Sequence, residues 1–235
     1  MSNAPKNATE KVLQQNFIKE LTHYKWNAPD YLDGNKQTVT VQDLVNNWRR
    51  ELNRMNADQL EGVELPDGEF KQVMTKVSLI SNSYEAAKIL AIEESKGKID
   101  GIYRDDNPKI TRKQITLTIF KKAEVRGGDS SYQIAREIQT PNGNRFDIVL
   151  LINGLPLINI EQKRTDKSLD EAFGQFQRYY RDGEYTNNFM AFSQMMVVTT
   201  EIETRYFATP KSADEFNPSF VFHWSDKENK PINNW

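Results

Sequence analysis

The sequence predicts a layered fold of the α/β or α+β class with a mainly helical N-terminal part. Over the first ninety-odd of the 235 residues, apolar side chains recur at the spacing of a helix. After Gly97 the pattern changes to short runs rich in β-branched and aromatic residues, separated by turn clusters. A helical pattern returns at residues 168–182, and further β-rich runs follow it. This order is typical of a sheet covered by helices.

Two of the predicted helices begin at recognisable caps. Thr9 can cap the first, and Thr40, with Asp43 three residues later, resembles the capping box that starts a helix. The residues expected to face inward are Leu13, Phe17, Leu21 and Tyr24 in the first helix, and Leu44, Val45, Trp48, Leu52 and Met55 in the second. Residues 67–94 predict one or two further helices, broken near Ser81-Asn82-Ser83.

Strands are predicted wherever a β-rich run lies between turn clusters. They are expected at 99–104, 115–120, 132–138, 145–152, 157–163, 195–200, 205–208 and 219–224. In the last run Phe220, Phe222 and Trp224 alternate, which favours packing in a core. We expect residues 1–8 to be a disordered or tag-like start and 9–235 to form a single domain. Within it, 9–96 would be mainly helical and 97–235 would carry the sheet and the site.

The composition is that of a polar globular chain rather than of a protein that holds DNA by charge alone. Hydrophobic residues make up 37% of the chain and charged residues 27%, and the net charge is −2. Because phosphate neutralisation dominates DNA affinity, a self-sufficient DNA-binding protein is usually basic. The chain has no cysteine, which excludes disulfides and thiolate metal sites. It also has no apolar run of membrane length, so no membrane partner is expected.

Two predicted strands around an Asn153-Gly154 turn carry unexpected charge. Asp147 lies inside the first strand, and the second runs into Glu161-Gln162-Lys163. Alternate residues of a strand share a face, so Glu161 and Lys163 point the same way. A strict two-residue loop would set Asp147 opposite Ile160, on the other face. A three-residue loop or a bulge would bring Asp147 to the face of Glu161, and Pro156 argues against a regular ladder beside the turn.

If Asp147, Glu161 and Lys163 converge, they suit metal-dependent hydrolysis of a phosphodiester. Two carboxylates form a hard-oxygen site of the kind that Mg²⁺ prefers, completed by a backbone carbonyl, phosphate oxygens and waters. The metal can activate a water and stabilise charge on the phosphodiester, and a lysine can orient or deprotonate that water. The plainer alternative is that the E-x-K stretch only marks a strand emerging into solvent.

The next predicted helix offers two further candidates. It begins at a capping box formed by Ser168 and Glu171. Gln175 and Tyr179 are spaced four residues apart, on one flank of its apolar stripe. They are placed to reach across the strand ends toward DNA or the metal ligands. Alternatively, Tyr179 is a boundary core residue and Gln175 merely lies on the surface.

Taken together, these motifs resemble the N-terminal nuclease domain of the R (restriction and translocation) subunit of type I restriction-modification enzymes. That family is marked by an Asp in the first strand, an N-G-L-P-L turn into an E-x-K strand, and a Q-x-x-x-Y motif on the next helix. The matching positions here are Asp147, 153–157, 161–163 and 175–179. The stretches "TEKVLQQNFIKEL" near the start and "ETRYFA" at 203–208 are also similar to the family.

The resemblance implies an α/β fold with a PD-(D/E)xK, restriction-endonuclease-like core, in which helices flank a mixed central sheet. It implies Mg²⁺ as the cofactor, with Asp147, Glu161 and the backbone carbonyl of Gln162 as metal ligands. Lys163 would complete the catalytic set. Gln175 and Tyr179 would bind DNA or support the site.

The resemblance also implies partners and a location. It implies cleavage of double-stranded DNA without sequence preference at the cut, in a bacterial or archaeal cytoplasm. The partners would be motor domains of the same subunit and the modification and specificity subunits. ATP would bind only in the missing motor domains, because no G-x-x-x-x-G-K-[ST] motif occurs in these 235 residues.

One position departs from the family pattern. The family's N-terminal helix often carries a glutamate where this sequence has Gln14, and Glu10, one turn earlier, is the candidate substitute. Two other functions stay open: a non-catalytic docking scaffold of the same fold, and a related nuclease of the repair or resolvase type.

Overall fold

The computed structural model describes residues 10–91, 97–121, 128–164 and 169–232, and a mixed sheet of seven strands lies at its centre. In spatial order the strands are β1 (Val39–Thr40), β4 (Tyr132–Gln139), β5 (Arg145–Ile152), β6 (Leu155–Gln162), β7 (Met195–Thr199), β8 (Thr204–Ala208) and β9 (Phe222–His223). The β1–β4 and β6–β7 pairs are parallel and the others antiparallel. The expected α/β class is confirmed, and the architecture is restriction-endonuclease-like.

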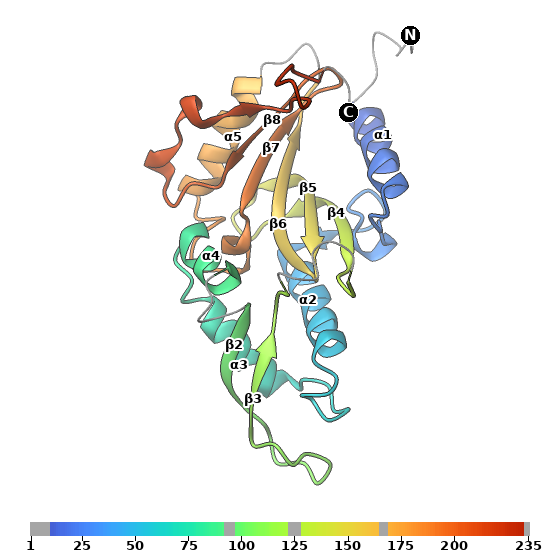
Figure 1. Ribbon diagram of the computed structural model, residues 1–235, viewed down its shortest axis with the longest axis vertical. Coiled ribbons are helices and arrows are strands. Elements are labelled where there is room, and N and C mark those ends of the chain that lie inside the picture. Colours follow the sequence, from blue (N-terminus) through green and yellow to red (C-terminus); the bar gives the residue numbers. More distant parts are fainter. Residues whose placement is uncertain (1–9, 92–96, 122–127, 165–168, 233–235) are drawn as a thin grey trace.

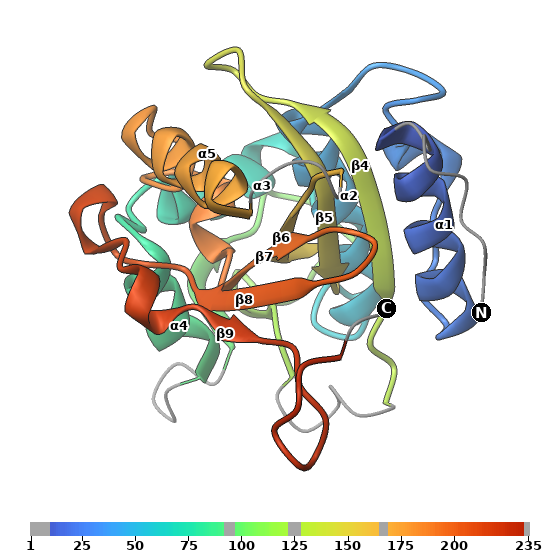
Figure 2. The ribbon, with the colours of Figure 1, turned by 90° about the horizontal axis from the view of Figure 1, so that it is seen from above.

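Helices cover both faces of this sheet. The helices are α1 (Glu10–His23), α2 (Val41–Met55), α3 (Asp67–Val77), α4 (Ser83–Ala91) and α5 (Leu169–Arg181). Helix α1 lies on one face, and α2 and α5 lie on the other (Figures 1 and 2). The α1 face is held by a small apolar cluster that includes Ile18 and Ile148, whereas the opposite face belongs to the main core around Trp48 and Phe176.

The predicted start of the second helix is confirmed in detail. The Thr40 side chain accepts from the backbone N–H of Asp43, and the Asp43 carboxylate accepts from the backbone N–H of Thr40 at 2.8 Å. This capping box directs Leu44, Trp48 and Leu52 into the core, where all three are fully buried. The predicted break near 81–83 is also confirmed, because α3 ends at Val77 and α4 begins at Ser83. Residues 1–9 and the expected cap at Ser168 lie outside the described residues.

Two predicted strands form a separate small sheet. Strands β2 (Lys98–Tyr103) and β3 (Gln114–Thr118) pair only with each other and pack near α3 and α4, away from the central sheet (Figure 1). Conversely, the central sheet includes β1, which no pattern indicated, because two residues are too few to show alternation.

Two expectations about the core were wrong. Tyr24 lies beyond the end of α1 and is 73% exposed. Phe220, Phe222 and Trp224 are also more than half exposed, because β9 is a two-residue strand that pairs only with β8 at the sheet edge. Phe222 and Trp224 instead contact the ring of Tyr206 at the surface. Within the described residues, no helix is long and apolar enough to cross a membrane.

Candidate active site

The hairpin of β5 and β6 is irregular in the way that the site requires. Beside the turn, Leu151 pairs with Pro156, but the next pair is Leu150 with Ile158, so Leu157 is an extra residue on β6. Pro156 has no N–H to give to a regular ladder, and a bulge accommodates it. The bulge shifts the pairing by one residue, so the register leads to Asp147 opposite Glu161 instead of Ile160. The expectation that this is not a plain two-residue hairpin is confirmed.

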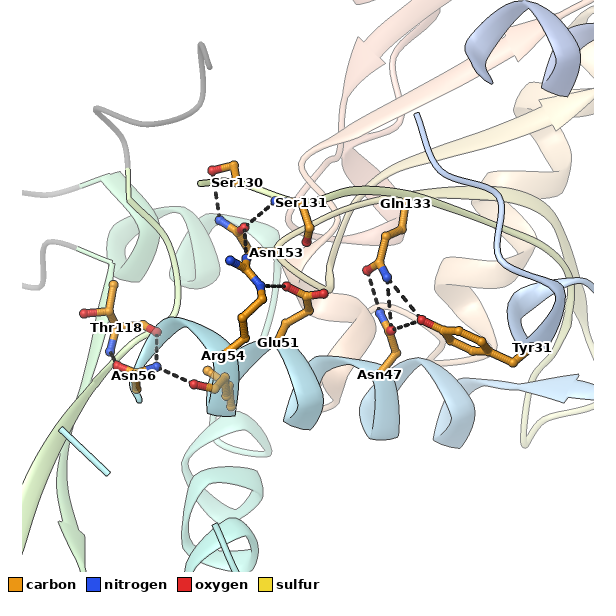
Figure 3. Close-up of polar contacts among 11 residues, drawn as sticks. Tyr31, Asn47, Glu51, Arg54, Asn56, Thr118, Ser130, Ser131, Gln133 and Asn153 are labelled. Carbon is orange, nitrogen blue, oxygen red and sulfur yellow. Dashed lines mark hydrogen bonds and ion pairs between the residues drawn. The ribbon is translucent and has the colours of Figure 1, made fainter. Parts of the chain in front are cut away.

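The turn end of this hairpin is fixed against α2 (Figure 3). Asn153 and Gly154 both have positive φ, as a tight two-residue turn requires. The Asn153 side chain accepts from the backbone N–H of Ser131 at 2.9 Å and donates to Ser130. A Cβ on Gly154 would lie 2.8 Å from the Cα of Trp48, so only glycine allows this close approach.

At the other end of the hairpin, the two predicted carboxylates meet. Asp147 Oδ2 accepts from the backbone N–H of Gln162 at 3.0 Å. The Asp147 and Glu161 carboxyl groups lie against each other, and this contact helps to raise the pKa of Glu161. Lys163 Nζ lies 3.6 Å from Glu161 Oε2, and the Lys163 backbone N–H is held by Thr199 of β7. The three residues predicted to act together are therefore adjacent.

Helix α5 supports this cluster with the two predicted side chains. Gln175 Nε2 donates to Glu161 Oε2 at 2.7 Å and also contacts the Tyr179 hydroxyl. Tyr179 in turn donates to the backbone carbonyl of Arg145 at 2.7 Å. The pair thus ties the end of β6 to the beginning of β5. Tyr179 is buried and packs against Phe146, so the alternative that it belongs to the core is confirmed.

The electrostatics of the site favour capture of a cation. Burial raises the pKa of Glu161 well above its usual range, and the charge of Asp147 raises it further. Burial also raises the pKa of Asp147, although the Gln162 N–H and the Lys163 charge oppose this. Burial raises the pKa of Tyr179 above its usual value, so its hydroxyl stays a hydrogen-bond donor at neutral pH. The cluster contains two buried carboxyl groups and one lysine, so a bound cation would offset negative charge there.

The donor set fits Mg²⁺. Asp147 and Glu161 provide hard carboxylate oxygens at one point, and phosphate and water would have to supply most other ligands. Among the described residues, no group of three or more His, Cys, Asp or Glu side chains is arranged to hold a metal. The Gln162 side-chain amide is buried and has no hydrogen-bond partner among the described residues.

Comparison with known proteins gives the family. A family model described as type I restriction enzyme R protein N terminus matches residues 7–215. The chain belongs to this family. The type I restriction enzyme SauCOLORF180P endonuclease subunit of Staphylococcus aureus (strain COL) is 35% identical over 202 residues, which cover 84% of this chain and 20% of that protein. The EcoprrI endonuclease subunit of Escherichia coli is 25% identical over 225 residues, covering 85% of this chain and 66% of that protein.

A third relative, the SsaAORF53P endonuclease subunit of Staphylococcus saprophyticus, is 33% identical over 202 residues. The chain spans about a fifth of the length of the staphylococcal relatives that it matches. It is thus an R-protein N-terminal domain, and what the longer proteins do as a whole is a separate question.

This R-protein domain differs from the pattern expected at its first helix. Gln14 is buried, donates to Glu137 Oε1 at 2.7 Å and approaches the Asp147 carbonyl at 3.5 Å. A glutamate at position 14 would bring two carboxylates into contact there. Glu10 is exposed and lines the cavities beside Asp147, so it is not part of the buried cluster.

Reasoning from the sequence missed Glu137 as a residue beside the site. It lies on β4 where the register leads across to Asp147, and its charge acts on that carboxyl group. Its φ is +54°, a strained conformation for a residue with a side chain, and Gly34 packs directly against its backbone. The pairing of β4 with β5 brings Glu137 here, and nothing within the mixed polar and apolar sequence of β4 marks this residue.

Proposed function

We propose that this chain is the Mg²⁺-dependent endonuclease domain of a type I restriction enzyme R subunit, hydrolysing DNA phosphodiester bonds without sequence preference at the cut. The observation that carries the proposal is the meeting of Asp147, Glu161 and Lys163 at one end of a hairpin whose bulge sets their register. A strand that merely emerged into solvent would leave Glu161 exposed, but this side chain is 1% exposed.

Each residue of the site would have its own role in the reaction. Asp147 and Glu161, with the backbone carbonyl of Gln162, would hold Mg²⁺. When bound, the ion supplies a Lewis acid that lowers the pKa of a water and offsets charge on the phosphodiester. Lys163 would orient that water or accept its proton, and its ammonium would stabilise negative charge on the reacting phosphate.

The supporting residues keep this geometry. Gln175 holds one Glu161 oxygen, leaving the other for the metal, and Tyr179 anchors Gln175 and the start of β5. Because Tyr179 remains protonated, its hydroxyl would position groups without exchanging protons during the reaction. These contacts preorganise the carboxylates, which is where a metal site gains much of its affinity.

The proposed partners follow from the family. The relatives are named as endonuclease subunits of type I restriction enzymes, and most of their length lies outside the matched region. We propose that double-stranded DNA is the substrate and that ATP-driven motor domains of the same subunit deliver it. Modification and specificity subunits would complete the enzyme in a bacterial or archaeal cytoplasm. A repair or resolvase-type nuclease is a weaker proposal, because the family model matches R proteins.

The test is cleavage of plasmid DNA by the 235-residue chain with Mg²⁺ or Mn²⁺. Asp147→Ala, Glu161→Ala and Lys163→Ala should each abolish nicking, whereas Asp67→Ala, an exposed acid on α3, should leave it unchanged. Calorimetric titration of metal with and without duplex gives an independent measure of binding. Absence of both metal binding and cleavage, with duplex present and a folded protein, would favour the docking-scaffold alternative.

A further inference from the structure

Two cavities flank Asp147, and one arginine lies at the rim of both. The α1 cavity, of about 270 Å³, is lined by Gln14, Glu137 and Gln162. The α5 cavity, of about 310 Å³, is lined by Lys163, Gln175 and Arg178. Arg145 and Asp147 line both cavities. Glu10 also lines both cavities, so Arg145 is the one basic residue that the two cavities share.

The backbone of Arg145 is fixed relative to the carboxylates, although its side chain is 60% exposed. Its carbonyl accepts from the Tyr179 hydroxyl at 2.7 Å, and Tyr179 contacts Gln175, which holds Glu161. Arg145 is also only two residues before Asp147 on β5. The base of the guanidinium is thus placed by the same contacts that build the site, while its charged end remains in solvent.

Within the described residues, this guanidinium makes one ion pair, through Nε. Arg145 Nε pairs with Glu137 Oε2 at 3.0 Å, and within the described residues Glu137 is its only acidic partner. The two terminal amino groups stay available, and that planar fork matches the oxygens of a phosphate. Glu137 keeps a second partner of its own, because Gln14 donates to its other oxygen at 2.7 Å. If Arg145 moved away, the Glu137 carboxylate would still be hydrogen-bonded.

We propose that Arg145 binds a backbone phosphate of the DNA next to the one that is cut, and that Glu137 holds Arg145 until the DNA arrives. The identity of the ligand rests on the proposed nuclease function. A partly exposed ion pair is weak, so a phosphate can replace the carboxylate at little cost. Lys11 lines the α1 cavity and Arg178 lines the α5 cavity, so each cavity has a further basic residue beside Arg145.

Under this proposal, the two members of the ion pair have opposite effects on the affinity for DNA. Arg145 contributes an attractive contact, whereas Glu137 competes with the phosphate for it. A pair with a purely structural role would behave differently, because loss of either member would weaken the same contact. Binding to DNA therefore distinguishes the two roles by the sign of the change.

The experiment measures binding of a fluorescent 20-base-pair duplex to the full 235-residue chain by anisotropy, in EDTA to prevent cleavage, at several salt concentrations. Arg145→Gln should weaken binding about tenfold and reduce the salt slope by about one. Glu137→Gln should strengthen binding about two- to fivefold, the range for release from an exposed ion pair. Arg145→Lys should keep the salt slope but lose part of the affinity, because it retains the charge without the fork.

A matched control lies at the opposite end of the hairpin. Arg54 pairs through Nε with Glu51 Oε2 at 2.9 Å, beside the Asn153 turn (Figure 3). Arg54→Gln removes the same charge and the same type of contact, and it should leave the salt slope within about 0.3 of the wild type, against a change of about one for a phosphate contact. Thermal unfolding of every variant checks that each is folded.

Two results would overturn the proposal: unchanged binding by Arg145→Gln, or weaker binding by Glu137→Gln. If either occurs while the wild type still nicks plasmid in an Asp147-dependent manner, the phosphate contact is wrong and the nuclease function stands. If the wild type neither binds duplex at low salt nor cleaves, the nuclease function fails and the Arg145 contact fails with it.

Discussion

Replacement of Glu161 by glutamine is expected to stabilise the metal-free protein, although the same change should abolish metal binding. The Glu161 side chain is 1% exposed and lies against the Asp147 carboxyl group, and both features raise its pKa well above the ordinary value of 4.5. A carboxyl group with a raised pKa in the folded state contributes stability at low pH, where it is protonated in both states. That contribution is lost as the pH rises toward the folded-state pKa.

The size of the effect follows from the shift in pKa. Each unit by which folding raises the pKa of Glu161 corresponds to about 1.4 kcal/mol of stability lost above that pKa. A glutamine at 161 does not titrate, and its side-chain oxygen can still accept from Gln175, which now donates at 2.7 Å. The lost contact with Lys163 is long, at 3.6 Å. We therefore expect a gain of about 1–4 kcal/mol at pH 8, the range seen when uncharged side chains replace a buried ion pair.

The assay is urea unfolding of both proteins in EDTA between pH 4 and pH 8.5. The difference in the free energy of unfolding should be small at pH 4 and should grow as the pH rises. Saturating Mg²⁺ or Mn²⁺ should raise the stability of the wild type alone, because under the proposed function only the wild type would bind the ion in its folded state. The slope against urea should stay the same in both proteins, since the exposed area does not change.

A second buried glutamate provides a control, because its replacement should change the free energy of unfolding in the opposite direction. Glu69 is fully buried but pairs with the equally buried Arg104 at 2.7 Å. Glu69→Gln leaves that guanidinium without its counter-charge and should cost about 3–5 kcal/mol. If Glu161→Gln also destabilises the metal-free protein at pH 8, the site is not short of positive charge. The electrostatic argument for a cation there would then be wrong.

Three further substitutions test the contacts around the site. Gly154→Ala should lower the free energy of unfolding in urea by about 2–5 kcal/mol, because the backbone is left-handed and the new Cβ would clash with α2. The control is Gly62→Ala, at φ +74° with no neighbour within 4 Å, which should lower it by only about 1–2 kcal/mol. Gln14→Glu should destabilise the protein by about 1–3 kcal/mol in urea unfolding at pH 7, because a carboxylate replaces the donor to Glu137. Tyr179→Phe should cost about 0.5–1.5 kcal/mol and slow plasmid nicking at every pH from 6 to 9 without changing the shape of the pH profile, since the hydroxyl does not ionise in that range.

Local signals in the sequence predicted much of the fold and most of the site. The capping box at Thr40 and the turn at Asn153-Gly154 are contained within a few residues, and each is found where expected. The placement of Asp147 beside Glu161 could be stated only as a condition on the hairpin, because a single bulge reverses the face. Pro156 was the residue that favoured the bulge, and the shift in register does occur beside it.

The residues that were missed depend on contacts between distant segments. Glu137 reaches Asp147 only because β4 pairs with β5 and because Gly34, a hundred residues earlier, allows its unusual backbone. The prediction that Phe222 and Trp224 pack in a core was wrong for a related reason. Alternation predicts that a strand has two faces, but burial of Phe222 and Trp224 would need another element to cover the sheet edge.

The hairpin of β5 and β6 explains why a core element carries two carboxylates. Its turn end is fixed by the contact of Gly154 with α2, and the bulge at Pro156 sets the register from there. The regular pairing stops at Ile148 and Ile160, so the strands separate where Asp147 and Glu161 stand. Both carboxylates are buried there, and Asp147 lines the two cavities beside it. A rigid apolar hairpin therefore delivers two acids to one point at the sheet end, which a flexible loop could not do with the same precision.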